Sequence, residues 1–481
     1  MAGTLKEKTA NGLMWSGIAN VGIQVLNLAI GIVLGRLLLP SDYGIVGLLT
    51  IFITLAGSLS SSGFSNALIN AEPTDNDYNS VFWFNITVSL SCYVLLFFSA
   101  PLIADFFHQP ILIPLSRFLF LCFILSASGM TYNAYLVKNM KNREMAIISL
   151  TALVISGSVG VLLAWSGKGV WSLAWQQMIY ISVVTIGRFC FVPWHPVFHF
   201  DFAPIKRMFP FSVNLLLTNI ITTISQQMLT VAFGRLFPVN AVGNYTQSNK
   251  WSTMGSQTVS GMLQQITQPV LVSVRNEQSR ERLIFRKMLR FTSFISFPCL
   301  FGLALVSHEF IIVTIGKKWT ECIPLLQILC ISGAFLPFYT LYLNLAISHG
   351  KSNINMWLTI GQIVLQMAII FLLYPFGMFF MVIAFTVLCV LWLGICHLFT
   401  YHLINLHFVD VLKDIIPFMI AAIVVMLGTY FITRDIHSLW ILLLTRIIIA
   451  ALSYYAIMRI FNVVILKECI QFLKNKRDHH E

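Results

Sequence analysis

The sequence predicts an all-α integral membrane protein, and three observations carry that prediction. Hydrophobic residues make up 57% of the 481 residues and charged residues only 10%, whereas soluble domains carry about 25% charged residues. About fourteen apolar runs are long enough to cross a bilayer. A polar-striped helix with its terminal motif recurs after about 200 residues. These features predict two six-helix lobes related by a pseudo-twofold axis along the membrane normal, plus two C-terminal helices.

Each predicted span is an apolar run of roughly 20 residues, enough for a hydrocarbon core about 30 Å thick. In chain order the runs cover residues 13–35, 43–65, 81–104, 111–136, 145–165, 169–190, 209–233, 241–270, 291–314, 322–347, 354–373, 376–398, 413–432 and 438–461. The eighth run is diluted by polar residues. An even number of spans places both ends of the chain on the same side.

The Lys and Arg residues divide unevenly between alternate loops. With cytoplasmic termini, 21 of them lie in inner segments and 7 in outer segments, while Lys250 and Arg446 fall within spans. Cytoplasmic loops carry an excess of Lys and Arg, so we expect a multi-pass protein with both termini in the cytoplasm. The same bias accounts for the net charge of +12 without a nucleic-acid partner.

Interruptions in the apolar pattern predict the domain boundaries. Pro193, Pro196 and Pro204 break the pattern between the sixth and seventh spans. The predicted parts are an N-terminal six-helix lobe at 1–195, a C-terminal six-helix lobe at 205–405, two additional transmembrane helices at 410–465 and a basic cytoplasmic tail at 466–481. Since the loops are short, none of them has room for a soluble catalytic domain.

The repeat indicates where a binding site lies. Asn20, Gln24 and Asn27 of the first span recur as Asn219, Thr223 and Gln226 of the seventh, at steps that keep them on one helix face. Gly35-Arg36-Leu37-Leu38-Leu39-Pro40, closing on Gly44, recurs as Gly234-Arg235-Leu236-Phe237-Pro238, closing on Gly243. Two copies of one polar-striped helix suggest two halves that face a shared site.

The eighth span carries a second polar stripe around Lys250. Its members recur at steps of three and four: Thr246, Asn249, Lys250, Thr253, Ser256, Gln257, Ser260, Gln264, Thr267 and Gln268. One interpretation is that these groups join neighbouring helices by hydrogen bonds. The other is a hydrated cavity between the halves, in which Lys250 supplies positive potential, because ionisable residues within spans are functional by default.

The predicted substrate-binding residues line this cavity. They are Lys250, Asn20, Gln24, Asn27, Asn219, Thr223, Gln226, Asn249, Gln257 and Gln264, with Arg36 and Arg235 at the outer rim. A cation together with many amides favours an anionic substrate rich in hydroxyl groups. Motifs of phosphate loops, zinc proteases and nucleophile elbows are missing from the sequence, so we expect no enzyme activity, no catalytic residue, no metal and no cofactor.

Several motifs resemble those of bacterial oligosaccharide flippases. They are Gly35-Arg36-Leu37-Leu38-Leu39-Pro40-Ser41-Asp42-Tyr43-Gly44, Gly63-Phe64-Ser65-Asn66-Ala67-Leu68-Ile69, Ala100-Pro101-Leu102-Ile103-Ala104-Asp105-Phe106-Phe107 and Gly243-Asn244-Tyr245. These flippases form the O-antigen and colanic-acid exporter branch of the multidrug/oligosaccharidyl-lipid/polysaccharide exporter superfamily. The chain departs from the usual Gly-x-Tyr-x-x-Ala at Ser248, a small residue in place of alanine.

The resemblance implies a function in surface polysaccharide biosynthesis, for O-antigen, capsule or exopolysaccharide. Undecaprenyl-pyrophosphate-linked oligosaccharide units would cross the bacterial inner membrane to the periplasmic leaflet by alternating access. The implied partners are the lipid-linked substrate, membrane lipids, and the polymerase and glycosyltransferases of the same pathway. Two alternatives stay open: a multidrug or cation antiporter of the same superfamily, and a flippase for the peptidoglycan lipid precursor.

Overall fold

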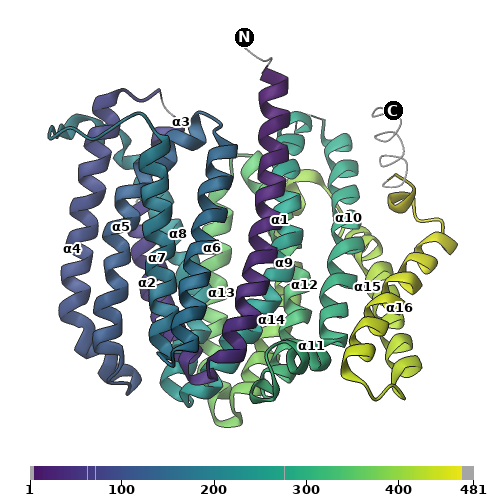
Figure 1. Cartoon of the computed structure of the whole chain (residues 1–481). Helices are drawn as coiled ribbons and strands as arrows, with labels where there is room; N and C mark the ends of the chain where they lie inside the picture. Colours follow the sequence, from purple (N-terminus) through teal and green to yellow (C-terminus); the bar gives the residue numbers. More distant parts are fainter. Residues whose placement is uncertain (1–4, 62, 71, 276, 469–481) are drawn as a thin grey trace. The chain divides into compact units, whose positions relative to one another are not determined.

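The computed structural model describes residues 5–61, 63–70, 72–275 and 277–468, and every regular element within these ranges is helical (Figure 1). The predicted all-α class is therefore confirmed. The predicted basic tail at 466–481 lies outside the described residues except for its first three positions. The side chain of Gln264 also lies outside them.

A long helix is found at each of the fourteen predicted spans within these ranges. The first seven are α1 (Leu5–Leu37), α2 (Pro40–Ser61), α4 (Asp75–Phe107), α5 (Leu112–Lys138), α6 (Asn142–Trp165), α7 (Val170–Phe191) and α8 (Phe202–Leu236). The others are α9 (Val239–Val274), α10 (Gln278–Leu305), α12 (Cys322–Ser348), α13 (Ser352–Leu373), α14 (Met378–Ile404), α15 (Phe408–Thr433) and α16 (Leu439–Ile460). The short helices α3 (Phe64–Asn70) and α11 (Ser307–Thr314) were not predicted separately.

Twelve helices of the described chain are long and apolar enough to cross a membrane. Among the fourteen long helices, α7 and α9 do not meet this criterion. Helix α9 is the one whose apolar character is diluted by its polar stripe, and α7 carries Gln176, Gln177 and Arg188. Both helices can still lie within the bilayer when their polar faces contact other helices or water rather than lipid.

The described helices group into two compact units, unit 1 (Met1–Gly243) and unit 2 (Asn244–Glu481). This division falls after the boundary predicted at 195–205, because α8 packs with α2 and α4 of unit 1. Ser58 of α2 and Thr223 of α8 lie 3.5 Å apart through their hydroxyl oxygens. By its contacts, α8, the seventh predicted span, therefore belongs to unit 1 together with the first six.

Unit 1 is built around α4, α5, α6 and α7, with α1 packed on α6 and α2 on α5 (Figure 1). The segment that follows α7 lies against α4 in an irregular conformation. The buried Asn79 holds this segment: its amide donates to the His199 carbonyl at 2.6 Å and accepts from the Val197 N–H at 2.8 Å. Trp83 Nε1 also donates to the Val197 carbonyl, at 2.8 Å. The proline-rich stretch is thus anchored rather than loose.

Replacing Asn79 by Ala should release this segment. The variant leaves the Val197 N–H and the His199 carbonyl without their side-chain partner, at a cost of about 1–3 kcal/mol. Hydrogen–deuterium exchange should become faster across residues 195–200. Asn139→Ala, which removes an exposed amide at the end of α5, is the control. Equal protection of the segment in both variants would contradict the anchoring role.

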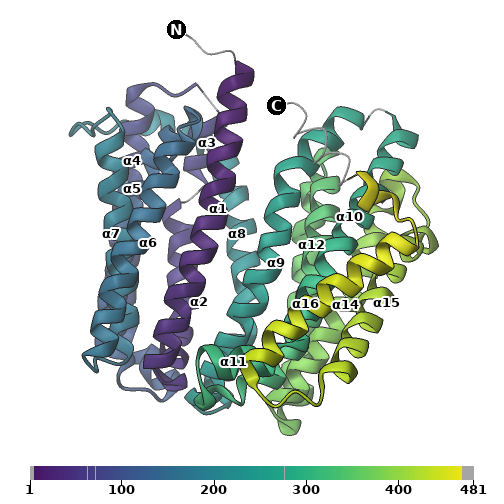
Figure 2. The same ribbon diagram turned by 45° about the vertical axis from the view of Figure 1, so that its right-hand side comes forward.

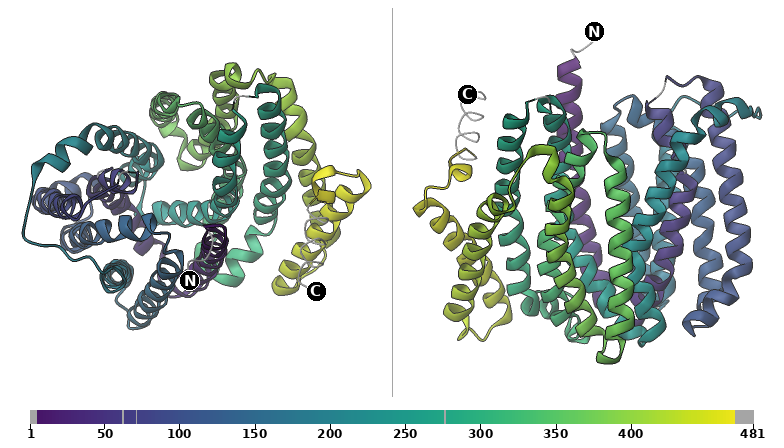
Figure 3. Two further views of the ribbon diagram at one scale, coloured as in Figure 1. Left: turned by 90° about the horizontal axis from the view of Figure 1, so that it is seen from above. Right: turned by 180° about the vertical axis from the view of Figure 1, so that it is seen from behind.

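Unit 2 centres on α10 and α12, with α14 and α15 against them and α16 packed on α15 (Figure 2). Its aromatic core includes Phe297 and Phe338, whose ring centroids are 5.8 Å apart, and Phe335, which contacts both. Viewed from above in Figure 3, several helices of unit 1 are seen nearly end-on, so they run roughly parallel within that unit. Long helices aligned in this way are the architecture expected of a helical membrane bundle.

Candidate functional site

The two copies of the repeated motif meet in unit 1. A Cβ atom on Gly44 would overlap the carbonyl oxygen of Val239, and a Cβ atom on Gly243 would overlap the carbonyl oxygen of Pro40. The first turn of α2 and the first turn of α9 therefore approach each other through glycine. Close approach of membrane helices depends on small residues at the contact. Both glycines occupy the equivalent position of the repeat, so the contact is reciprocal.

The two arginines of the repeated motif lie in the last turns of α1 and α8. Both are exposed within the described structure. Arg235 has specific neighbours: its Nη1 lies 2.9 Å from Nδ1 of His108, and its guanidinium lies 5.7 Å from the centroid of the Phe106 ring. A cation in the last turn of a helix is stabilised by the helix dipole. Arg36 and Arg235 are thus placed equivalently, as the repeat predicts.

The predicted polar residues of α1 and α8 lie on accessible parts of unit 1. Asn20, Asn219 and Gln226 are exposed, while Gln24, Asn27 and Thr223 are half-buried. Helix α1 packs on α6 through another face, where Gly157 lies against Ile30 and Gly22 against Leu150. The amides of α1 therefore lie on a different face from the one that packs on α6.

Helix α9 divides its polar residues between two faces. Ser248 donates to the Cys322 carbonyl at 2.9 Å, and Ser252 donates to the Leu329 carbonyl at 2.7 Å. These serines, with the buried Asn244 that donates to Glu321 at 2.9 Å, fasten one face of α9 to α12 and the segment before it. These three residues do not belong to the predicted polar stripe of α9, and they join the helices by hydrogen bonds.

The opposite face of α9 carries the predicted binding residues. Lys250 and Gln257 are seven residues apart, so they share a face. At about 100° per residue, this face lies on the other side of the helix from Ser248 and Ser252. Lys250 is half-buried with its ammonium 5.9 Å from the centroid of the Trp251 ring, Asn249 is half-buried and Gln257 is exposed. The cation and the amides are thus separated from the packing serines.

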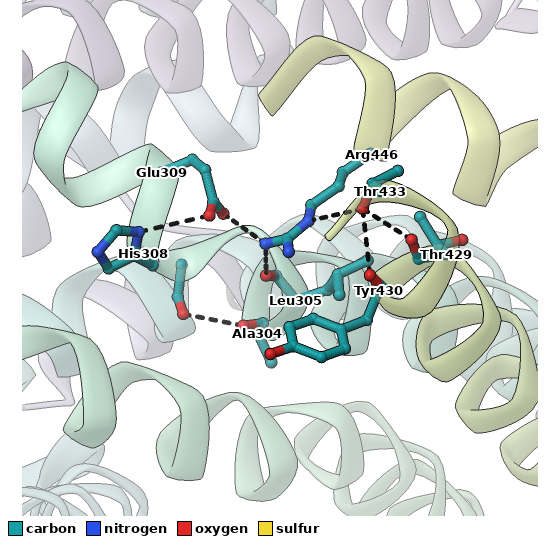
Figure 4. Close-up of polar contacts among 9 residues, drawn as sticks. Ala304, Leu305, His308, Glu309, Thr429, Tyr430, Thr433 and Arg446 are labelled. Carbon is teal, nitrogen blue, oxygen red and sulfur yellow. Dashed lines mark hydrogen bonds and ion pairs between the residues drawn. The ribbon is translucent and has the colours of Figure 1, made fainter. Parts of the chain in front are cut away.

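The buried ion pair Arg446–Glu309 lies near one end of unit 2, and neither residue is among the binding residues predicted from the sequence. Arg446 of α16 donates through Nη1 to Glu309 of α11 at 2.9 Å and to the Leu305 carbonyl at 3.3 Å (Figure 4). Its Nε donates to the Thr433 hydroxyl at 3.2 Å, and its guanidinium lies 5.2 Å from the Tyr430 ring centroid. This network joins α11 and α16, with α15 contributing Thr433 and Tyr430.

A second charged cluster joins α10 to α15 at the other end of α10. Asp414, whose side chain is 1% exposed, accepts from Arg286 Nε and Arg290 Nε, each at 2.6 Å. Nearby, the buried Glu281 contacts His349 Nε2 at 2.9 Å. Each of these buried carboxylates has a cation or a histidine as its partner. Within the described chain, no group of three His, Cys, Asp or Glu side chains could hold a metal ion.

Comparisons with known proteins identify the family. The family model described as "Polysaccharide biosynthesis protein" matches residues 33–324. The chain is 26% identical over 337 residues to the Lipopolysaccharide biosynthesis protein WzxC of Escherichia coli (strain K12), covering 69% of this chain and 68% of the relative. It is 24% identical over 392 residues to the Teichuronic acid biosynthesis protein TuaB of Bacillus subtilis (strain 168), covering 81% and 80%.

Solved structures share the fold. The Lipid II flippase MurJ in its inward closed conformation matches with a TM-score of 0.70 at 16% identity, over 95% of this chain and all of that one. An inward-facing MATE family transporter of the MOP superfamily matches with a TM-score of 0.65 at 16% identity, over 81% and 98%. The resemblance drawn from the sequence motifs is thereby confirmed, and the chain belongs to the polysaccharide biosynthesis protein family.

Proposed function

We propose that the protein transfers undecaprenyl-pyrophosphate-linked oligosaccharide units from the cytoplasmic to the periplasmic leaflet of the bacterial inner membrane. Relatives named for the biosynthesis of lipopolysaccharide and teichuronic acid support a lipid-linked precursor of a surface polysaccharide as the substrate. A further relative, 23% identical over 359 residues and covering 74% of this chain and 73% of its own length, is the Succinoglycan biosynthesis transport protein ExoT of Rhizobium meliloti (strain 1021).

The observation that carries this proposal is the division of α9 into two faces. Ser248 and Ser252 hold one face against α12, and the other presents Lys250 together with Gln257. Lys250 places a positive charge on this face, and an ionisable residue within a membrane span is functional by default. Amides that are not used for packing can donate to and accept from sugar hydroxyls. A pyrophosphate joined to sugars can contact both the cation and the amides.

The proposed roles follow from these chemistries. Lys250 contacts the pyrophosphate, and Arg36 and Arg235 supply positive potential at the rim. The residues assigned to the sugars are Asn20, Gln24, Asn27, Asn219, Thr223, Gln226, Asn249, Gln257 and Gln264. No covalent step is needed, because the protein lowers the cost of moving a charged, hydroxylated group through hydrocarbon. Alternating access, with the termini in the cytoplasm, then delivers the group to the periplasmic side.

Replacing Lys250 by Glu should abolish transfer, because a carboxylate at this position repels the pyrophosphate. Surface polysaccharide, measured in a deletion strain complemented with the variant, should fall at least about tenfold, equivalent to about 1.4 kcal/mol of lost interaction. Lys250→Arg keeps the charge and should retain most of the transfer.

The matched control is Lys413→Glu, the same change at an exposed position of α15, which should leave the polysaccharide near the wild-type amount. Membrane abundance of all three variants is measured alongside. Wild-type polysaccharide from a normally expressed Lys250→Glu variant would remove Lys250 from the mechanism. Efflux of cationic dyes by the purified protein in vesicles would instead favour the antiporter alternative.

A further inference from the structure

Unit 2 contains a cavity whose lining includes none of the predicted substrate-binding residues. It measures about 340 Å³ and lies between α10, α15 and the segment that follows α16. Its charged lining consists of Arg286, Lys287 and Arg290 from α10, with Glu468 as the only carboxylate in that lining. Its apolar lining consists of Leu283, Phe418, Val463, Val464 and Ile465. A cavity lined by both cations and apolar side chains is suited to an amphiphile.

The buried carboxylate of Asp414 orients two of the three cations, Arg286 and Arg290. Asp414 is fully paired, since it accepts from both Nε and Nη2 of Arg286, at 2.6 and 3.1 Å, and from Nε of Arg290 at 2.6 Å. It is not part of the cavity lining. Asp414 therefore orients the two guanidinium groups without taking up space in the cavity.

One guanidinium keeps donors for a ligand. The side chain of Arg290 is 45% exposed, and within the part of the chain that the structure describes its two Nη groups make no hydrogen bond. Lys287 is paired with Glu468 at 2.8 Å, but both side chains are exposed. An exposed pair of this kind contributes only about 0–1 kcal/mol, so an anion can displace Glu468 at little cost. Arg290 and Lys287 can then bind one anion together.

The position in the chain suits a membrane headgroup. The cations lie in the first half of α10, close to the end of that span, and Val464 and Leu283 of the lining are exposed apolar side chains. A neighbouring cavity of about 400 Å³ shares Val463 and adds Arg459 and Lys467. Basic pockets between helix ends, at the level of the headgroups, are the sites where anionic lipids are recognised.

We propose that this cavity binds the phosphate of an anionic membrane phospholipid, with an acyl chain along Phe418 and Val464. The charge-assisted hydrogen bonds come from Arg290 and Lys287, while Arg286 adds positive potential. The site is separate from the α9 face and does not depend on the proposed transport of oligosaccharide. A lipid held here contacts both α10 and the segment after α16, so it should stabilise their packing.

The test measures lipid binding by the purified full chain. Phosphatidylglycerol added to the protein in a neutral detergent should raise the melting temperature, and phosphatidylcholine should not. In Lys287→Ala/Arg290→Ala the apparent affinity for phosphatidylglycerol should be about tenfold weaker or more. Arg286 and Asp414 are left intact, so the buried carboxylate keeps a partner and the fold should survive.

The matched control is Arg280→Ala/Lys413→Ala. It removes two positive charges at exposed positions of α10 and α15, and neither residue lines the cavity. It should bind phosphatidylglycerol as the wild type does. Equal binding by the cavity variant and this control would overturn the proposal. Equal stabilisation of the wild type by inorganic phosphate or glycerol phosphate would also overturn it, because the ligand would then be a soluble phosphate and not a lipid.

Discussion

Replacing Arg446 by Ala is expected to lower the stability of unit 2 by about 3–5 kcal/mol, the usual cost of stranding one partner of a buried ion pair. Both side chains of the Arg446–Glu309 pair are nearly inaccessible, at 6% and 4% exposed. The variant also removes the donors to the Thr433 hydroxyl and the Leu305 carbonyl (Figure 4). Thermal unfolding followed by tryptophan fluorescence should show a melting temperature lower by about 6–20 °C.

Two further variants separate the buried charge from the loss of a side chain. Arg459→Ala removes an exposed arginine from the same helix, and its melting temperature should stay within about 2 °C of the wild type. Glu309→Gln/Arg446→Gln removes both charges and should recover much of the loss, because no buried charge is left unpaired. If Arg446→Ala has the same melting temperature as Arg459→Ala, the Arg446–Glu309 ion pair does not hold α16 to α11.

Replacing Gly243 by Ala is expected to disrupt the contact between the first turns of α2 and α9. The added Cβ would overlap the Pro40 carbonyl oxygen and lie 3.1 Å from the Gly44 nitrogen. Backbone atoms cannot move aside as the end of a flexible side chain can, so the two helix starts must separate. Overpacking of this kind costs about 1–3 kcal/mol or more. Transport should fall along with the melting temperature, because the repeated motif is pushed apart.

The control for Gly243→Ala is Gly57→Ala in α2, where no atom lies within 4 Å of the added Cβ. Alanine is a better helix former than glycine by about 1 kcal/mol, so this variant should be as stable as the wild type or more stable. Gly44→Ala should reproduce the defect of Gly243→Ala, since its Cβ would overlap the Val239 carbonyl oxygen. A Gly243→Ala protein with wild-type melting and transport would show that the contact is not tight.

The helices were predictable from the sequence because membrane spans are set by local composition. An apolar run of sufficient length must be helical, since no other open structure satisfies its backbone in lipid. Helix α9 was predicted as the eighth run although its polar stripe dilutes it, and it is not among the twelve helices that are apolar enough to cross a membrane. The short α11 was merged with α10, since nothing in the sequence marks the break at Val306.

The candidate site was predictable in part. The repeat pointed to α1 and α8, the second polar stripe pointed to α9, and the structure leaves Asn20, Gln226 and Gln257 exposed. The predicted stripe of α9 did not include the two serines that pack against a neighbouring helix. Ser248 and Ser252 bond to carbonyl groups of residues 322 and 329, and only the tertiary structure shows which helix provides them.

The buried ion pairs could not be predicted because their partners are far apart in the sequence. Arg446 and Glu309 are separated by 137 positions, and Arg286 and Asp414 by 128. Arg446 was recognised as lying within a span, but local patterns do not show which carboxylate it meets. The division of the units at Gly243 likewise depends on contacts of α8 with α2 and α4.

The attachment of α9 to α12 through Ser248 and Ser252 restricts how Lys250 can move. Rotation of α9 about its own axis would break two side-chain bonds to α12 carbonyls, so the two helices should travel as one rigid pair during the transport cycle. A spin label at an exposed position of α12, such as Ile331, would therefore report the displacement of Lys250 without altering the face that carries it.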